Sequence, residues 1–248
     1  MPYRRLPNTD QARIRALKLA VEKGDRSDIY ELAISVKTLS EARNFLLKYE
    51  GAQAYYKECY ENQSKAGHKH QANIRMARLF ISHFIQVLNM AMLRAEIKKS
   101  RRELYGLPVD NSNVPDLASE ATIVEWGRKI IAGEQKRLSE GGSPIYNPTI
   151  AKVKVHYDIF MEGYEQQKNM QSITNRSLDE LASMRGRADE IILDIWNQVE
   201  AKFKKVKPKE LRMEKCQEYG VIYYYRANNK VDDNQEQKQG QEQELNFE

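Results

Sequence analysis

The sequence predicts an all-α protein: an elongated antiparallel helical bundle, or a coiled-coil-like hairpin of long helices, with short accessory helices and one C-terminal extended segment. Two long runs carry this prediction. Their apolar residues alternate three and four positions apart. This spacing places them on one face of an α-helix and predicts that another helix packs against that face. The runs extend from Leu39 to Ala95 and from Ile150 to Val199. Only one segment, residues 221–225, has the composition of a convincing strand.

Each long run has an inward face that the spacing defines. In the first run this face consists of Leu39, Ala42, Leu46, Tyr49, Tyr56, Tyr60, Ile74, Ala77, Ile81, Phe84, Leu88 and Ala91. In the second it consists of Ile150, Val153, Tyr157, Phe160, Tyr164, Leu178, Leu181, Ala188, Ile192, Ile195 and Val199.

Both runs become polar at their centres, near Gly67 and Thr174. Each run is therefore either one long helix or a hairpin that folds back at the polar centre. Neither centre contains proline, so the sequence leaves both alternatives open, and we favour unbroken helices.

Shorter helices are expected on either side of the long runs, at residues 9–23, 28–37, 122–140 and 208–219. Thr9 or Asn8 can cap the first of them, and Thr122 with Glu125 has the spacing of a capping box for the third. Asn147-Pro148 predicts the start of the second long run, and Ser177 with Glu180 forms another possible capping box within it. A loop is expected at 105–116, which is rich in glycine, proline and asparagine.

Composition predicts a single helical domain over residues 1–226 and a disordered, acidic, glutamine-rich tail over 227–248. The chain has 248 residues and a net charge of +5. The tail contains two lysines and six acidic residues, so it carries −4 and the body carries +9. A basic body is compatible with an anionic partner, although ordinary soluble proteins have the same balance. Leu245 and Phe247 near the end of the tail are a candidate docking peptide.

The start of the chain lacks the apolar segment of a secretory signal, and no stretch approaches about 20 consecutive apolar residues. We therefore expect a cytoplasmic protein without a membrane partner. The two cysteines, Cys59 and Cys216, have no ligand or redox motif around them and are expected to be free thiols.

Catalytic and metal-binding signatures are missing at workable spacing. The sequence has no Glu-x-x-His pair for a bundle metal site, no Gly-x-Ser-x-Gly and no phosphate-binding glycine loop. We expect His68 and His70 to be solvated. No catalytic, cofactor-binding or metal-ligating residue is assigned, no cofactor is expected, and enzyme activity is left open with a preference against it.

Three groups of residues are candidate binding features. A polar stripe, which can line a pocket, form an interior network or face water, comprises Arg75, Arg78, Ser82, His83, Gln86 and Asn89. Basic clusters at the ends of the two runs comprise Lys98, Lys99, Arg101 and Arg102, and Lys202, Lys204, Lys205, Lys207 and Lys209. Such cations complement helix dipoles, and they form one cap on the bundle only if the runs fold as two hairpins. A partner-binding strand or packed aromatic strap comprises Val221, Ile222, Tyr223, Tyr224 and Tyr225.

Three stretches resemble a family of uncharacterised bacterial, mostly helical proteins. They are Tyr3–Asp10 with Ala12-Arg13, the stretch Ala77–Met90, and Tyr219-Gly220-Val221. The likeness extends from the start of the chain to about Arg226. It implies a bacterial cytoplasmic protein with one cooperative fold, and it implies no activity, cofactor or site.

Taken together, the sequence favours a non-enzymatic helical interaction or scaffold protein that binds a protein partner or itself. One alternative is a nucleic-acid or ribosome-associated protein that uses the basic helix ends. Another is an enzyme or small-ligand binder built around the polar stripe near His83.

Overall fold

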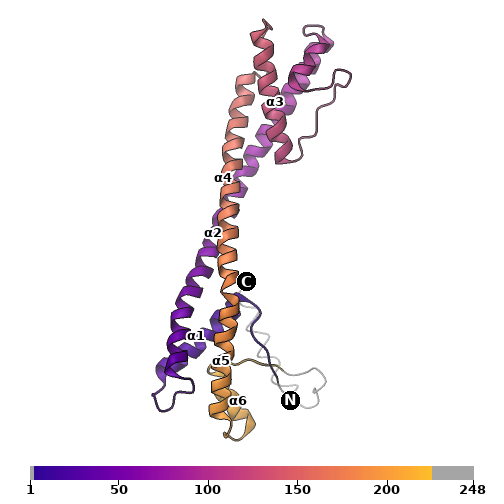
Figure 1. Ribbon diagram of the computed structural model, residues 1–248. Coiled ribbons are helices and arrows are strands. Elements are labelled where there is room, and N and C mark those ends of the chain that lie inside the picture. Colours follow the sequence, from indigo (N-terminus) through magenta and orange to yellow (C-terminus); the bar gives the residue numbers. More distant parts are fainter. Residues whose placement is uncertain (1–2, 225–248) are drawn as a thin grey trace, which may run out of the picture. The chain divides into compact units, whose positions relative to one another are not determined.

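The computed structural model of the protein describes residues 3–224. Over this range the chain is all-α, with six α-helices, one 3-10 helix and two very short strands (Figure 1). The helices are α1 (Asp10–Arg26), α2 (Val36–Leu93), α3 (Glu120–Ser139), α4 (Ile150–Ser183), α5 (Arg185–Phe203) and α6 (Lys209–Gln217), and the 3-10 helix η1 spans Lys99–Tyr105. The strands are β1 (Tyr3–Arg4) and β2 (Tyr223–Tyr224). Tyr225, the predicted tail and its Leu245 and Phe247 lie outside the described residues.

The described residues form two compact units. Unit 1 combines residues 3–54 with 180–224, and unit 2 is the contiguous segment 55–179. The backbone of α2 passes from one unit to the other at residues 54 and 55, and that of α4 does so at 179 and 180. Whether residues 1–226 unfold as one domain stays a prediction.

In unit 1, α1 packs against α5, and α5 packs against α6. The buried face of α2 here contains Leu39, Ala42, Leu46 and Tyr49, as the first apolar run predicts. The buried face of α5 contains Ile192, Ile195 and Val199, and Trp196 beside them is only 1% exposed. Residues three and four apart on each helix thus meet in one core.

In unit 2, α2 and α4 run antiparallel. His70 stacks on Phe160 and Phe80 stacks on His156, so residues later in α2 meet residues earlier in α4. Helix α3 packs on both, because the Tyr157 hydroxyl donates to the Val124 carbonyl at 2.8 Å and Gly127 lies against Tyr157 and Ile81. Ile81, Phe84, Ile123, Ile130, Val153 and Phe160 are fully buried at the centre.

The long runs are unbroken at their polar centres. Helix α2 continues through Gly67, and α4 continues through Thr174 to Ser183. The second run is interrupted instead at Met184, and α5 begins at the next residue, Arg185. Of the predicted inward positions, Tyr60 is wrong, because its side chain is 58% exposed.

Several predicted helix starts are wrong because a nearby side chain supplies the cap instead. Helix α3 begins after Ser119, whose hydroxyl accepts from the Thr122 amide. Helix α4 begins after Thr149, whose hydroxyl accepts from the Lys152 amide at 3.3 Å, rather than at Asn147. Ser177 lies inside α4 and donates to the Thr174 carbonyl. No helix forms at 28–35, where the chain makes turns before α2.

One helix of the described range, α2, is long and apolar enough by composition to cross a membrane, contrary to the expectation from the sequence. Of its most apolar 18-residue window, 44% is buried inside the protein. Core helices of soluble proteins pass the same test, so this finding by itself does not place the chain in a bilayer.

Candidate functional site

The predicted polar stripe on α2 does not form a single site. Ser82 donates back to the Leu79 carbonyl of its own helix, and Arg78 donates to the Ala118 carbonyl at 2.8 Å. Asn89 is 9% exposed and donates to the Ser112 carbonyl at 2.6 Å. The stripe therefore divides into groups that fix the loop before α3 and groups that face solvent. Arg75, His83 and Gln86 belong to the second kind and are exposed.

A different face of α2 is left uncovered in unit 2. Met76, Leu79, Met90 and Leu93 are 40%, 55%, 55% and 70% exposed, although the opposite face of the same helix is the core of the unit. The exposed His83 and Gln86 lie between these two apolar pairs. We call the row of six residues the α2 seam: Met76, Leu79, His83, Gln86, Met90 and Leu93.

The α2 seam has the spacing of a coiled-coil interface. Successive members are three, four, three, four and three residues apart, which keeps them on one side of an α-helix. The apolar character of this helix on most of its circumference is visible in the sequence and predicts a central helix that touches more than one neighbour. That prediction is confirmed, because α3 and α4 both pack on α2, but these two helices leave the α2 seam exposed.

The first predicted basic cluster serves the fold of unit 2 rather than forming a cap. Arg102 is 3% exposed, donates to the Pro108 carbonyl at 2.6 Å and is bonded to the Asn89 side chain. Burial lowers the pKa of its guanidinium. Arg101 pairs with Glu140, and Lys98 and Lys99 are exposed. Within this cluster only Lys98 and Lys99 form neither an ion pair nor a side-chain hydrogen bond with a described residue.

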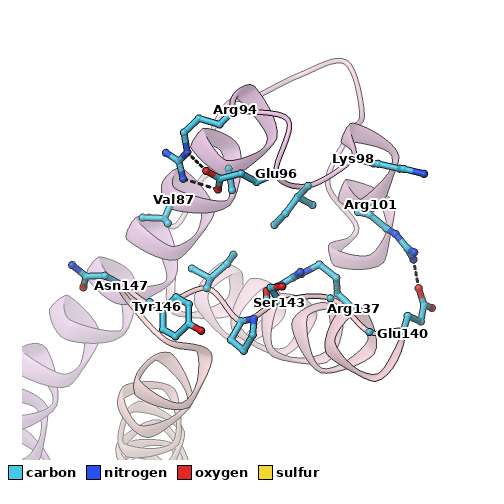
Figure 2. A pocket seen from close by; sticks show the side chains of 16 residues that line it. Val87, Arg94, Glu96, Lys98, Arg101, Arg137, Glu140, Ser143, Tyr146 and Asn147 are labelled. Carbon is cyan, nitrogen blue, oxygen red and sulfur yellow. Dashed lines mark hydrogen bonds and ion pairs between the residues drawn. The ribbon is translucent and has the colours of Figure 1, made fainter.

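A cleft of about 750 Å³ opens between the end of α2 and the segment that connects α3 to α4 (Figure 2). Ion pairs bridge its rim: Arg94 donates to Glu96 at 2.6 and 3.0 Å, and Arg101 is bonded to Glu140. In this lining Arg94 and Arg101 each have an acidic partner, and Arg137 is paired with the buried Glu134 beneath the cleft. Lys98 forms no ion pair with a described residue, so the cleft keeps one unpaired positive charge.

Beneath the cleft a buried cluster joins η1 to α3. Arg137 donates to Glu134 at 2.7 and 2.8 Å, to the Tyr105 hydroxyl at 3.0 Å and to the Ser143 carbonyl at 2.7 Å. Glu134 and Arg137 are 1% and 5% exposed. The bond to Glu134 raises the pKa of Arg137, and burial raises the pKa of Tyr105. Every polar group of the cluster is used structurally, and sequence reasoning missed it because Glu134 and Arg137 resemble an ordinary surface pair.

The second predicted basic cluster belongs to unit 1, whereas the first belongs to unit 2. Lys204 lines a cleft of about 520 Å³ together with Lys209 and Arg212, and none of the three forms an ion pair with a described residue. The acid in this cleft, Glu200, accepts from Arg4 at 3.1 Å and from the Tyr223 hydroxyl at 2.9 Å. The cleft therefore has a net positive lining. We call it the unit 1 basic cleft. Lys202, Lys205 and Lys207 are exposed nearby in sequence.

The predicted strand is a packed strap over its described part. Tyr223 and Tyr224 pair antiparallel with Arg4 and Tyr3. Val221 is 2% exposed, and Ile222 is half-buried. Tyr223 lines the unit 1 basic cleft, and burial raises the pKa of its hydroxyl.

His70 is buried, so the expectation of two solvated histidines is wrong for it. Its side chain is 4% exposed and stacks on Phe160, and Nε2 lies 3.5 Å from Glu120. His68 is exposed, as predicted. Cys59 and Cys216 are free, as predicted. Among residues 3–224, no three His, Cys, Asp or Glu side chains gather to hold a metal ion.

Comparison with known proteins adds no relative: no family model, no curated protein and no solved structure matches the chain.

Proposed function

We propose that this protein is a non-enzymatic helical interaction protein and that the α2 seam is the surface that receives its partner. The exposure of Met76, Leu79, Met90 and Leu93 carries the proposal. Single exposed apolar residues are common on soluble proteins, but two exposed apolar pairs in one row at coiled-coil spacing are the pattern that a partner helix covers. The resemblance noted above supports a bacterial, cytoplasmic setting, which is likewise proposed.

The two flanks of the seam favour a docking surface over a surface made by chance. On one side Phe80 is held by its stack on His156, at 4.0 Å between ring centroids. On the other side Arg78 and Asn89 fix the loop before α3 by hydrogen bonds. The seam is thus presented by a rigid element with fixed neighbours, which lowers the entropy lost on binding.

Site-specific photo-crosslinking in the native host tests the proposal. A photoreactive amino acid at Leu79 or Met90 is expected to give discrete protein adducts. The same residue at Tyr60 is the matched control, since Tyr60 is 58% exposed on α2 but lies off the seam. Adducts from the seam positions alone support the proposal. No adduct from either seam position, or equal adducts from Tyr60, would contradict it.

A second candidate function rests on the unit 1 basic cleft. Lys204, Lys209 and Arg212 have no acidic partner among residues 3–224, and Tyr223 supplies an aromatic wall. Unpaired cations beside an aromatic ring suit a single-stranded nucleic acid, whose phosphates meet the cations while a base stacks.

Fluorescence anisotropy with a labelled 12-nucleotide RNA tests this second candidate. The observed affinity should fall steeply between 50 and 200 mM salt, and Lys204→Glu with Arg212→Glu should abolish binding. Lys57→Glu with Lys65→Glu is the control for net charge, because these two lysines are exposed in unit 2. No binding at 50 mM salt would remove this candidate.

A further inference from the structure

We infer that the partner of the α2 seam is a second copy of this chain, packed antiparallel with α2 against α2 about a two-fold axis between His83 and Gln86. This inference rests on the proposed function, because it names the occupant of the same surface. The juxtaposition that points to it is an apolar pair, a polar pair and an apolar pair along one exposed face.

The spacing of the seam is the same read in either direction. An axis midway between residues 84 and 85 places Met76 opposite Leu93 of the second copy, Leu79 opposite Met90 and His83 opposite Gln86. A two-fold interface requires such self-complementarity, since residue i must contact j while j contacts i. Antiparallel coiled coils pair the two alternating seam positions in this way. Six positions at this spacing are symmetric in any heptad row, so the self-complementarity rests on the residue types: reversal sets apolar residues against apolar residues and the two polar residues against each other.

The facing residues of the two copies are also chemically complementary, and we call each facing pair a level of the seam. The two outer levels on each side of the axis pair a leucine with a methionine, so the contact there contains no polar atom. The central level pairs His83 with Gln86, and neither forms a hydrogen bond with a described residue of its own chain. An imidazole and an amide each offer a donor and an acceptor, so the two can satisfy one another across the axis. A polar level of this kind fixes the register, because a shift would set His83 or Gln86 against an apolar residue.

The size of the seam sets the strength of the dimer. From Met76 to Leu93 the helix advances about 26 Å, and a strip about 10 Å wide along it presents on the order of 300 Å². A standard stable interface buries about 800 Å² per partner. The dimer is therefore expected to form in the range of tens to hundreds of micromolar rather than nanomolar.

Disulfide trapping of the full chain tests the register. In a background with Cys59→Ser and Cys216→Ala, the variants Leu79→Cys and Met90→Cys are oxidised separately and as an equal mixture at 200 µM. In the proposed register positions 79 and 90 of different copies face each other, whereas 79 and 79 are about 16 Å apart along the axis, too far for a disulfide. Cross-linked dimer is expected in the mixture alone. Tyr60→Cys mixed with either variant is the control.

Each other outcome of the trapping overturns the inference. Equal cross-linking of each variant alone would indicate a parallel pair. Cross-linking with Tyr60→Cys at the same rate would indicate random collision. No cross-linking in any mixture would indicate that the copies do not meet on this face.

Charge reversal supplies a second measurement that does not depend on oxidation. The double variant Leu79→Lys with Met90→Glu places opposite charges at two levels of the antiparallel dimer, and Leu79→Lys with Met90→Lys places like charges there. By sedimentation equilibrium the first is expected to dimerise at least tenfold more tightly than the second, because opposite charges face each other in the first and like charges in the second. Equal loss in both would overturn the register. Circular dichroism confirms that both variants fold.

Different experimental results would exclude the second copy as the partner and exclude the seam as a docking surface. If the wild-type chain stays monomeric at 500 µM while Leu79 cross-links to another protein in cells, the second copy is excluded and the docking surface stands. If Leu79 gives no adduct in cells, the proposed function fails with it. Flotation of the protein with phospholipid vesicles, lost on Leu79→Lys, would instead make the seam a membrane contact and overturn the inference.

Discussion

Asp10 is the residue at which three helices of unit 1 are joined. Its carboxylate accepts from Arg185 at 2.8 and 2.9 Å and from the Tyr49 hydroxyl at 2.7 Å, so it links α1, α2 and α5. The hydrogen bonds from Arg185 lower the pKa of Asp10 although burial opposes them. A lowered pKa means that this stabilisation is present above the pKa of the unfolded chain, about 3.9, and is lost as the pH falls through the folded value.

We predict that Asp10→Asn lowers the free energy of unfolding at pH 7 by about 1–2 kcal/mol, because charge-assisted hydrogen bonds become neutral. The difference from wild type should narrow as the pH falls below about 4, because the unfolded chain takes up a proton on Asp10 there, whereas the folded carboxylate, whose pKa is lower, does so only at more acidic pH. Urea unfolding at pH 7 and at pH 3.5 measures both. Asp158→Asn is the control, since its pair with Lys154 is solvent-exposed. A difference that is the same at both pH values would refute the explanation.

Helix α3 meets η1 at a glycine. A Cβ on Gly133 would lie 2.7 Å from the Leu104 carbonyl oxygen and 2.6 Å from the Tyr105 ring. We predict that Gly133→Ala destabilises the protein by about 1–3 kcal/mol, because the backbone of η1 must move. Gly51 is also inside a helix but has open space around its Cβ, so Gly51→Ala should stabilise by about 0.5–1 kcal/mol.

Thermal unfolding of the two alanine variants side by side decides the point. The two substitutions are expected to shift the melting temperature in opposite directions, because the gain in helix propensity acts at both positions and the steric clash acts only at residue 133. A stabilising effect at both positions would mean that the contact between α3 and η1 is loose.

At the scale of the helices, the sequence predicted the buried faces that follow from one periodic pattern. It missed the features that depend on which segments pack nearby. The α2 positions Ala42, Ile81 and Phe84 are buried as predicted, because a core face needs only three-four spacing to be read. The start of α4 was missed because Thr149 and Asn147 are both good caps, and packing chooses between them. The uncovered seam was missed because periodicity shows that a face is apolar, not whether anything covers it.

The molecule as a whole has two tryptophans, and each reports on one unit. Trp196 is 1% exposed in unit 1, and Trp126 lies half-buried in unit 2. Since helix formation propagates along a continuous backbone, and α2 and α4 each cross the boundary unbroken, we predict a single cooperative unfolding transition.

The measurement uses Trp126→Phe and Trp196→Phe, each of which leaves one fluorescent reporter. In each variant the fluorescence midpoint in urea should coincide with that of circular dichroism at 222 nm. Midpoints that separate in either variant would show that the units unfold independently and that residues 1–226 are two domains.

The order of the two units along the chain has a consequence for synthesis on the ribosome. The segment 55–179 is contiguous, whereas its neighbour is assembled from residues 3–54 and 180–224. Residues 3–54 therefore leave the exit tunnel long before helix α5, against which α1 packs, has been translated. During that interval the middle segment can complete its own core, while the apolar face of the nascent α1 stays uncovered and is open to a chaperone.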